Sequence, residues 1–325
     1  MIDASERALL EETVRKAVAN ASATPGGNAP VDAVLSSLGW LDLLEAAPRE
    51  ALDIVFGALG HANATATILD DVVASALGTP PRSDLAVLLP PFGAWDPPGR
   101  IERGRLRAHG LASGRVATAR ELLLVCGDAT QICVEVVPIA DAEIGRVQGV
   151  DPDAGFRAVR VERGAAVARS FDPRAWQTAV AHGRRAVGHQ IAGSCRAMLA
   201  LARSHALERL QFGRPIARFQ AVRHRLADAL VAVEALESAL VAAGDEPNPD
   251  TAALAKACAG RSARTVSAHC QQVLAGIGFT TEHAFARFLR RTLLLEGIFG
   301  CADDVLLSIG RRLLSERSVP ALIEL

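Results

Sequence analysis

The first part of the chain, residues 1–78, carries apolar side chains at helical spacing. Apolar positions that return every three or four residues indicate amphipathic helices, and TPGGNAP at residues 24–30 interrupts this pattern. Two further helical runs cover residues 48–59 and 64–77. We therefore predict an N-terminal helical domain over residues 1–78. The positions that define its first helix are Ala8, Leu9, Leu10, Val14 and Ala17.

The pattern changes at TPPRSD, residues 79–84. From there to about residue 163, short runs of branched apolar residues alternate with Gly, Pro and Asp. Runs of this length between turn signals predict a small antiparallel sheet or barrel, which we assign to a central β domain over residues 79–165. The runs are LAVLLP, ELLLVC, QICVEVVPI and FRAVRVE.

Helical periodicity returns at about residue 173 and continues toward the C-terminus. Long helices with short connections favour a helical bundle, which we assign to residues 166–325. The predicted fold is mainly α with a small central β domain. Neither an alternating βαβ pattern nor GxGxxG occurs, which argues against a Rossmann domain. The expected helices of the bundle cover residues 174–210, 219–243, 250–275, 282–299 and 303–317.

Charge and cysteine content narrow the class of protein. The chain has 35 basic and 36 acidic residues, so no overall field favours nucleic acid or an anionic membrane as a partner. No apolar run reaches membrane-spanning length. The 6 cysteines form no CxxC pair, so we expect no metal site, no disulfide framework and a cytoplasmic location.

One predicted helix corner, ERLQFGRPIARFQAVRHRLAD at residues 208–228, contains candidate binding chemistry. Arg209 lies where a long helix ends, and Gly213 lets the backbone of the turn approach a ligand. A guanidinium fork beside backbone N–H groups suits a phosphate. The same spacing also fits a plain helix–helix turn with an exposed arginine.

The amino-acid sequence of this corner resembles the R-x-Q-F-G-x-P-I-x-x-F-Q signature of acyl-CoA dehydrogenases. A second stretch, QVLAGIGFTTEHAFARFLRR at residues 272–291, resembles that family's Q-x-x-G-G-x-G-[FY]-T-x-E-x-P-x-x-R-x-x-R segment. The likeness is strong over residues 172–300 and weakest in the sheet region. It implies an acyl-CoA dehydrogenase-like fold: an N-terminal helical domain, a reduced β domain and a C-terminal four-helix bundle, assembled as dimers or tetramers.

The resemblance also implies a cofactor and a reaction. The family oxidises acyl-CoA thioesters, with a glutamate that removes the α proton and FAD that accepts the β hydride. By resemblance, Arg209 and Gln220 contact the pyrophosphate or ADP portion of FAD. Gln272 and the backbone through Gly276 hold the same half of a cofactor. In this family these groups typically reach across a subunit interface to the FAD of the neighbouring subunit. Ala275 stands where the family usually has a glycine, and its methyl group would crowd this contact.

Residues that would hold the flavin ring and supply the base depart from the family pattern. LLPPFGAWD at residues 88–96 and GRLRAHGLASG at residues 104–114 match the family's flavin-ring stretches only in part. Counted without gaps, Phe299 stands at the position of the usual base, and Gly183 stands at the alternative one. Glu296 comes three residues too early.

These departures predict a non-catalytic subunit of a heteromeric acyl-CoA dehydrogenase. Such degenerate subunits are known from actinobacterial sterol and steroid-ring catabolism, and the resemblance implies FAD shared with a catalytic partner that acts on an acyl-CoA. Two alternatives stay open: a self-sufficient homomeric dehydrogenase with Glu296 as a displaced base, and a cofactor-free structural or regulatory relative. If the chain is the non-catalytic subunit, Glu296 is expected to face solvent or a partner helix and to pair with Arg290 or Arg291.

The three tryptophans are assigned from their neighbours in the sequence. Trp40 and Trp176 stand in helical apolar patterns and are expected in cores. Trp95 lies in a proline-rich loop and is expected at a surface or partner contact.

Overall fold

The computed structural model describes residues 3–127, 131–164 and 169–317. Its N-terminal part is helical, as predicted. The first helix begins at a capping box, in which the Asp3 carboxylate accepts hydrogen bonds from the backbone N–H groups of Ser5 and Glu6, each at 2.8 Å. The helices are α1 (Ala4–Ser22), α2 (Ala29–Ser37), α3 (Trp40–Ala46), α4 (Pro48–Glu50), η1 (Ala51–Phe56), α5 (Gly57–His61) and α6 (Leu69–Ala76).

The segment predicted as one helix over residues 48–59 contains a π-helical stretch, η1. The next turn, α5, packs directly against the long helix α7 (Pro173–Glu208). A Cβ atom at Gly60 would lie 1.9 Å from the carbonyl oxygen of Gln190, and one at Gly193 would lie 2.2 Å from that of Gly57. The two helices therefore touch through their backbones, which only glycine allows at these positions.

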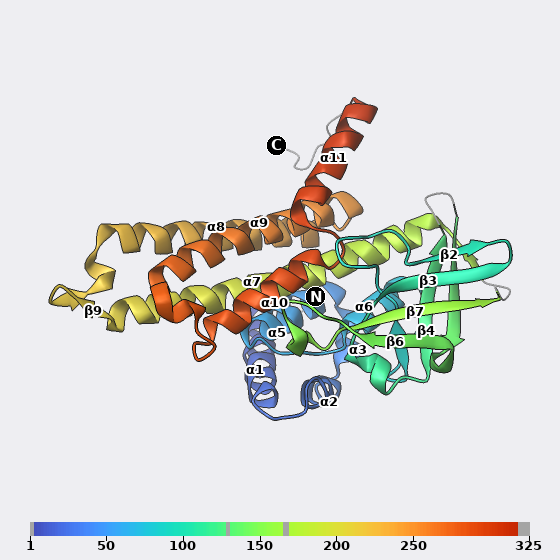
Figure 1. Ribbon diagram of the computed structural model, residues 1–325, viewed down its shortest axis with the longest axis horizontal. Helices are drawn as coiled ribbons and strands as arrows, with labels where there is room; N and C mark the ends of the chain where they lie inside the picture. Colours follow the sequence, from blue (N-terminus) through green and yellow to red (C-terminus); the bar gives the residue numbers. More distant parts are fainter. Residues whose placement is uncertain (1–2, 128–130, 165–168, 318–325) are drawn as a thin grey trace.

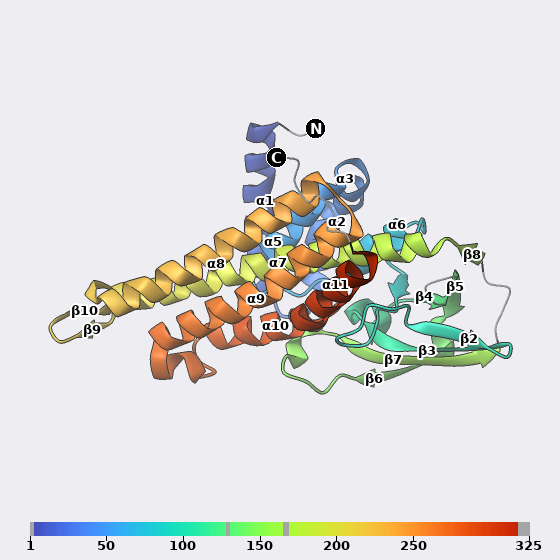
Figure 2. The ribbon, with the colours of Figure 1, turned by 90° about the horizontal axis from the view of Figure 1, so that it is seen from above.

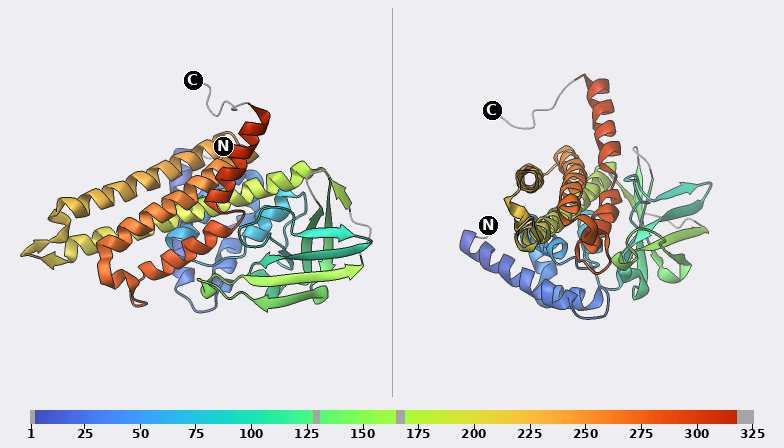
Figure 3. Two further views of the ribbon diagram at one scale, coloured as in Figure 1. Left: turned by 45° about the horizontal axis from the view of Figure 1, so that its top comes forward. Right: turned by 60° about the vertical axis from the view of Figure 1, so that its left-hand side comes forward.

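The central part forms one sheet at one end of the molecule (Figures 1 and 3). Strand order is β6-β7-β3-β2-β4-β5-β8, and β1 pairs with β4. Most neighbours are antiparallel, but β1 and β2 each run parallel to β4. The strands are β1 (Leu85–Val87), β2 (Gly99–Glu102), β3 (Arg105–Ala112), β4 (Glu121–Gly127), β5 (Ile132–Pro138), β6 (Ala142–Arg146), β7 (Arg157–Gly164) and β8 (Arg169–Phe171).

Four of these strands coincide with the predicted runs, and β2, β3, β6 and β8 were missed. The burial of β3 alternates, with Arg105 and Arg107 exposed and Leu106 and Ala108 buried. Arginines at every second position hid this strand from a search for apolar runs. Short 3₁₀ turns connect the strands: η2 (Gly114–Ala117), η3 (Ile139–Asp141) and η4 (Pro152–Ala154).

The C-terminal part is a helical bundle, as predicted, and α7 runs through its length (Figures 1 and 2). Asp172 caps α7 by accepting a hydrogen bond from the backbone of Arg174 at 2.9 Å, and Pro173 occupies the first turn. Helix α7 packs against α8, α9, α10 and the N-terminal helices α5 and α6. The remaining bundle helices are α8 (Gln220–Asp245), α9 (Pro249–Leu274), α10 (Phe285–Gly297) and α11 (Ala302–Glu316).

The predicted division into three domains stays a prediction, although the elements follow the same order. Helix α6 ends at Ala76 and β1 begins at Leu85, on either side of residue 78. The predicted boundary at residue 165 lies outside the described residues. Beyond it, β8 still pairs with β5, so the sheet extends past that boundary.

A buried ion cluster joins helix α6 to the sheet. Arg115 binds both oxygens of Asp71, with Nη2 at 2.9 Å from Oδ2, and its Nε lies 3.9 Å from Oδ2 of Asp70. Ser113 donates to the same Asp70 oxygen at 2.8 Å, and Trp40 donates to Asp71 at 3.0 Å. Burial raises the pKa of Asp70 to about 7. The positive charge of Arg115 offsets this effect only in part, because Asp70 and Asp71 share the one guanidinium.

Asp70→Asn is expected to flatten the pH dependence of stability. The pKa of this carboxyl is about 7 in the folded chain and about 4 in an unfolded one, so folding strengthens proton binding between these values. Its contribution to the free energy of unfolding is fully present below about pH 4 and is lost as the pH rises through 7. Chemical denaturation between pH 4 and pH 8 measures this decline. The exposed control Asp153→Asn should keep the wild-type slope, and an unchanged slope in Asp70→Asn would contradict the assignment.

Candidate functional site

The corner between α7 and α8 borders a cavity of about 790 Å³ at the end of the bundle farthest from the sheet (Figure 1). A two-stranded hairpin of β9 (Leu210–Gln211) and β10 (Arg214–Pro215) forms the corner and leads into η5 (Ile216–Arg218). Phe212 and Gly213 occupy its tip with φ of +52° and +74°. The opposite wall is the turn η6 (Ala275–Phe279), which follows α9.

Three of the four predicted binding residues line this one cavity. Arg209, Gln272 and Gly276 meet there from α7, α9 and η6, although Arg209 and Gln272 are far apart in the sequence. Gln220 does not line the cavity, but its neighbours Phe219 and Ala221 do. The predicted roles of these residues toward a cofactor stay predictions.

Two basic residues that the sequence analysis missed also line the cavity. His205 lies one turn before Arg209 on α7, and Arg225 lies one turn after Ala221 on α8. Arg225 lies within the quoted corner and His205 just before it, and their i,i+4 spacing from Ala221 and Arg209 is the signal that could have identified them. No Asp or Glu is among the described residues that line this cavity, so its polar lining favours an anion.

The turn at Ala275 has a conformation that glycine adopts readily and alanine does not. Its φ is +53° and its ψ is −136°. The departure from the family pattern is therefore a departure in sequence only, because the backbone keeps a glycine-like geometry. A Cβ atom at Gly276 would meet no atom within 4 Å, so the backbone of this turn faces open space.

Exposed large apolar side chains lie on the elements that border the cavity, and two of them, Phe212 and Ile277, line it. Phe212 is 91% exposed and Phe279 is 77% exposed. Phe219 packs edge to face on Phe212, with ring centroids 6.0 Å apart. Apolar groups gathered around a basic cavity are characteristic of a protein contact surface. We call this set the apolar rim: Leu207, Leu210, Phe212, Ile277 and Phe279.

The two positions at which the resemblance places a base lie in direct contact. Phe299 is 1% exposed and follows α10 with a φ of +58°. Its ring lies on Gly183 of α7, where an added Cβ atom would approach ring carbon Cε2 to 2.3 Å. One base position is thus filled by a ring, and the other lacks a side chain because the ring occupies its space.

Two buried cations hold the turn that carries Phe299. Lys256 of α9 donates to the carbonyl oxygens of Glu296 at 2.5 Å and Gly300 at 2.8 Å. Arg184 of α7 donates through Nε to the carbonyl oxygen of Phe299 at 3.1 Å. Burial lowers the pKa of Lys256 to about 8 and that of Arg184 to about 10.

Glu296 caps a helix of its own chain, and its expected pairing with Arg290 or Arg291 was wrong. Its Oε1 accepts a hydrogen bond from the backbone N–H of Ala302 at 2.9 Å, at the start of α11. The side chain is half-buried, so its expected contact with solvent or a partner helix stays a prediction. Arg291, one of its expected partners, pairs with Asp151 at 2.5 Å, and no ion pair joins Arg290 to Glu296 among the described residues.

The loop at residues 88–96 fills the space beside this turn. Phe92 lies on Gly297, where an added Cβ atom would approach its ring to 2.1 Å, and Gly93 donates to the carbonyl oxygen of Gly297 at 2.8 Å. Trp95 lies on Gly300, 2.6 Å from an added Cβ atom. Trp95 thus packs on a neighbouring turn but stays half-buried, and its expected role as a surface or partner contact stays a prediction. Trp40 and Trp176 are buried as predicted.

Comparison with known sequences identifies the C-terminal bundle. Residues 174–314 match the family model described as Acyl-CoA dehydrogenase, C-terminal domain. Acyl-CoA dehydrogenase IpdE2 of Mycobacterium tuberculosis is 36% identical over 99 residues, which are 30% of this chain and 31% of that protein. The short-chain specific acyl-CoA dehydrogenase of Megasphaera elsdenii is 32% identical over 137 residues, 41% of this chain and 36% of that protein. These matches span about a third of each curated relative.

Comparison with solved structures extends the likeness to the whole fold. A Tcur3481-Tcur3483 steroid ACAD variant has a TM-score of 0.81 at 21% identity, over 97% of this chain and 99% of that one. The ChsE4-ChsE5 complex from Mycobacterium tuberculosis has a TM-score of 0.72 at 22% identity, over 97% and 98%. At these identities the likeness establishes the fold alone.

Ala275→Gly is expected to stabilise the chain by about 1 kcal/mol, because it removes the strain of a positive φ at a residue with a side chain. Chemical denaturation measures the change. Ala239→Gly inside α8 is the matched control and should destabilise by about 1 kcal/mol, because its backbone is helical. A loss of stability in Ala275→Gly would contradict the strained geometry.

The family match of the bundle, and the order of helices, strands and bundle along the chain, agree with the resemblance found in the sequence. The predicted mainly α fold with a small β domain is confirmed. Residues 174–314 therefore belong to the acyl-CoA dehydrogenase C-terminal domain family, and the whole chain has the fold of the similar solved structures.

Proposed function

We propose that this chain is a non-catalytic subunit of a heteromeric, FAD-dependent acyl-CoA dehydrogenase, and that it completes a cofactor site of a catalytic partner. The observation that carries the proposal is the contact between Phe299 and Gly183. Abstraction of an α proton needs a group that accepts a proton, and neither residue can do so. The base must then come from the partner.

The corner cavity fits the diphosphate half of FAD. Its lining has Arg209, Arg225 and His205 but no described carboxylate, and the backbone at Gly276 is open. Such a donor set suits a pyrophosphate, with Arg209 as the guanidinium that binds it and Gln272 beside it. When bound, FAD supplies the hydride acceptor for α,β-dehydrogenation. This chain's own residues would bind and orient the cofactor.

Aromatic side chains cover the turn at which the resemblance places the base. Phe92 and Trp95 cover Gly297 and Gly300 there. These contacts leave the turn packed, whereas the corner cavity at the opposite end of α7 is open. The asymmetry supports a division of labour in which this chain holds one end of a cofactor and the partner holds the reactive end.

The apolar rim supports a protein partner. Phe212 and Phe279 lie beside the basic cavity, so a subunit docked on the rim would cover the cavity and exclude water from it. Two of the similar structures are named as assemblies of unlike chains, Tcur3481-Tcur3483 and ChsE4-ChsE5. We therefore propose a catalytic acyl-CoA dehydrogenase subunit as the partner.

The substrate proposed for the assembly is an acyl-CoA, and a steroid-derived one is favoured. One similar structure is named a steroid ACAD. A cytoplasmic location is proposed with it. In the described part of the chain, no helix combines the length and apolar content needed to cross a bilayer.

Co-expression with a candidate partner tests the proposal. Alone, the chain is expected to be colourless. The complex should be yellow, with about one FAD per unlike pair, and Arg209→Met should weaken its FAD binding at least about tenfold by removing a charge-assisted hydrogen bond. Arg203→Met, an exposed arginine earlier on α7, is the matched control and should retain FAD. A yellow and active homomer of this chain would overturn the proposal.

Glu296→Gln separates this proposal from a self-sufficient dehydrogenase. Glutamine keeps an acceptor oxygen for the backbone N–H of Ala302, so the cap persists at a cost of at most about 1 kcal/mol. Turnover by the assembled complex is expected to stay within about twofold of wild type, since general base catalysis contributes a far larger factor. Loss of turnover with FAD still bound would instead assign Glu296 as the base.

A further inference from the structure

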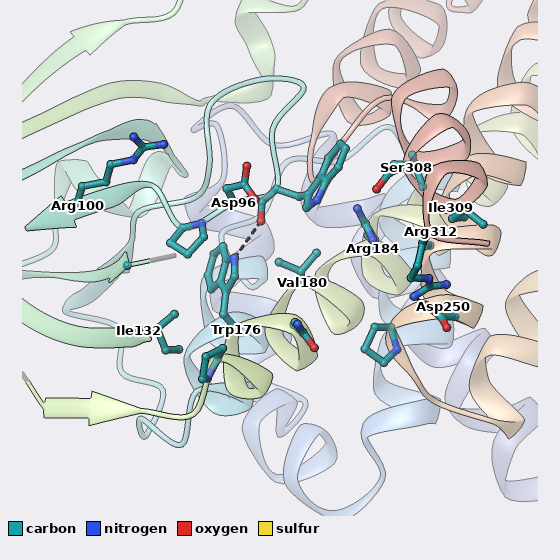
Figure 4. A pocket seen from close by; sticks show the side chains of 18 residues that line it. Asp96, Arg100, Ile132, Trp176, Val180, Arg184, Asp250, Ser308, Ile309 and Arg312 are labelled. Atoms are coloured by element: carbon teal, nitrogen blue, oxygen red, sulfur yellow. Dashed lines mark hydrogen bonds and ion pairs between the residues drawn. The ribbon is translucent and has the colours of Figure 1, made fainter. Parts of the chain in front are cut away.

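A second cavity lies at the other end of α7, between the sheet, the start of α9 and α11 (Figure 4). Its volume is about 450 Å³, within the usual range for small-molecule sites. Trp95, Trp176, Val180 and Ile309 give it apolar walls. Since the corner cavity is lined from residue 205 onward on α7 and this one from residues 173–184, the two cavities are separate.

Arg184 brings a charge to this cavity that the protein does not neutralise. It is only 8% exposed, and its guanidinium lies over the ring of Trp95, 5.4 Å from the centroid. Among the described residues its hydrogen bonding is the single contact of Nε with the Phe299 carbonyl, and it forms no ion pair. Buried charges in proteins are normally paired, so an unpaired one in a cavity wall indicates a missing anion.

The surrounding charges strengthen this argument. Lys256 is fully buried behind Arg184 and repels it, which adds positive potential to the same region. Glu296 faces Lys256, so one carboxylate stands against two buried cations. Burial is the cause that lowers the pKa of Arg184 to about 10, with no compensating carboxylate. An anion at this place would remove the imbalance.

The other charged groups of the lining are either paired or at the exposed edge. Arg312 forms an ion pair with Asp250. Arg100 and Asp96 are exposed, and Figure 4 shows Arg100 on the sheet side, away from Arg184. Arg184 is thus the buried cation that an occupant of the cavity can reach, among the described residues that line it.

We propose that this cavity binds a small apolar molecule with one carboxylate, which accepts hydrogen bonds from the guanidinium of Arg184 while its body packs against Trp176 and Val180. A single guanidinium balances a single negative charge and matches the two oxygens of a carboxylate. A phosphate monoester carries nearly two charges and would need further donors. The site is independent of the proposed cofactor site and needs no flavin.

Tryptophan fluorescence offers a direct test. The chain has 3 Trp and no Tyr, and Trp95 and Trp176 line this cavity, whereas Trp40 is buried at Asp71. Benzoate and hexanoate, titrated into the full chain without flavin, are expected to change the emission saturably. Benzamide and hexanamide, which have the same shape but no charge, should bind at least about tenfold more weakly.

Variants at two arginines assign the effect to the cavity. Arg184→Met should weaken benzoate binding at least about tenfold and abolish the preference over benzamide, and Arg184→Lys should retain part of that preference. Arg100→Met, the matched control at the exposed edge, should bind benzoate as the wild type does. Circular dichroism verifies that each variant is folded.

Equal affinity for benzoate and benzamide in the wild type would overturn the proposal without any variant. Absence of saturable binding by both carboxylates at millimolar concentration would do so as well. If the chain is soluble only with its partner, the same titrations are followed on the complex by ligand-observed NMR. Flavin retention by that complex is read separately, so failure of either proposal is distinguishable from failure of the other.

Discussion

The position of Lys256 determines the geometry of the chain reversal between α10 and α11. Its ammonium group is fully buried and donates to two carbonyl oxygens at the end of α10, those of Glu296 and Gly300. Carbonyl groups at a helix end otherwise lack partners, and leaving them buried and unpaired is costly. Once this lysine fixes the reversal, Phe299 must project toward α7, where Gly183 leaves room for its ring.

The two ends of α7 have opposite character. Toward its N-terminal end, the rings of Phe92, Trp95 and Phe299 pack around the turn at which the resemblance places the base. At its C-terminal end, Arg209 and the turn at Gly276 surround an open basic cavity with exposed aromatic rings. The packed turn at the base position and the open basic cavity thus lie at different places along one helix, and this arrangement is the physical argument for the proposed supporting role.

The bundle and the corner could be predicted because their signals are local. Helical periodicity located the bundle helices to within a few residues, and the spacing around Arg209 identified a binding corner. The fate of Glu296 could not be predicted, because its cap depends on where α11 returns after the reversal. The contact of Phe299 with Gly183 joins residues more than a hundred positions apart, and no local pattern encodes it. Strand β3 was missed for another reason. Exposed arginines alternate with its buried residues, so its sequence contains no continuous apolar run.

The backbone contact between α5 and α7 has a mechanical consequence. Where Gly60 and Gly193 bring two helices together without intervening side chains, neither helix can rotate or slide without displacing the other's backbone. We therefore expect helices α5 and α7 to move together as one rigid body. Helix α6 also packs on α7 and is joined to the sheet through Asp71 and Arg115, so the sheet is attached to the same body, whereas helix α11 projects from it (Figure 3).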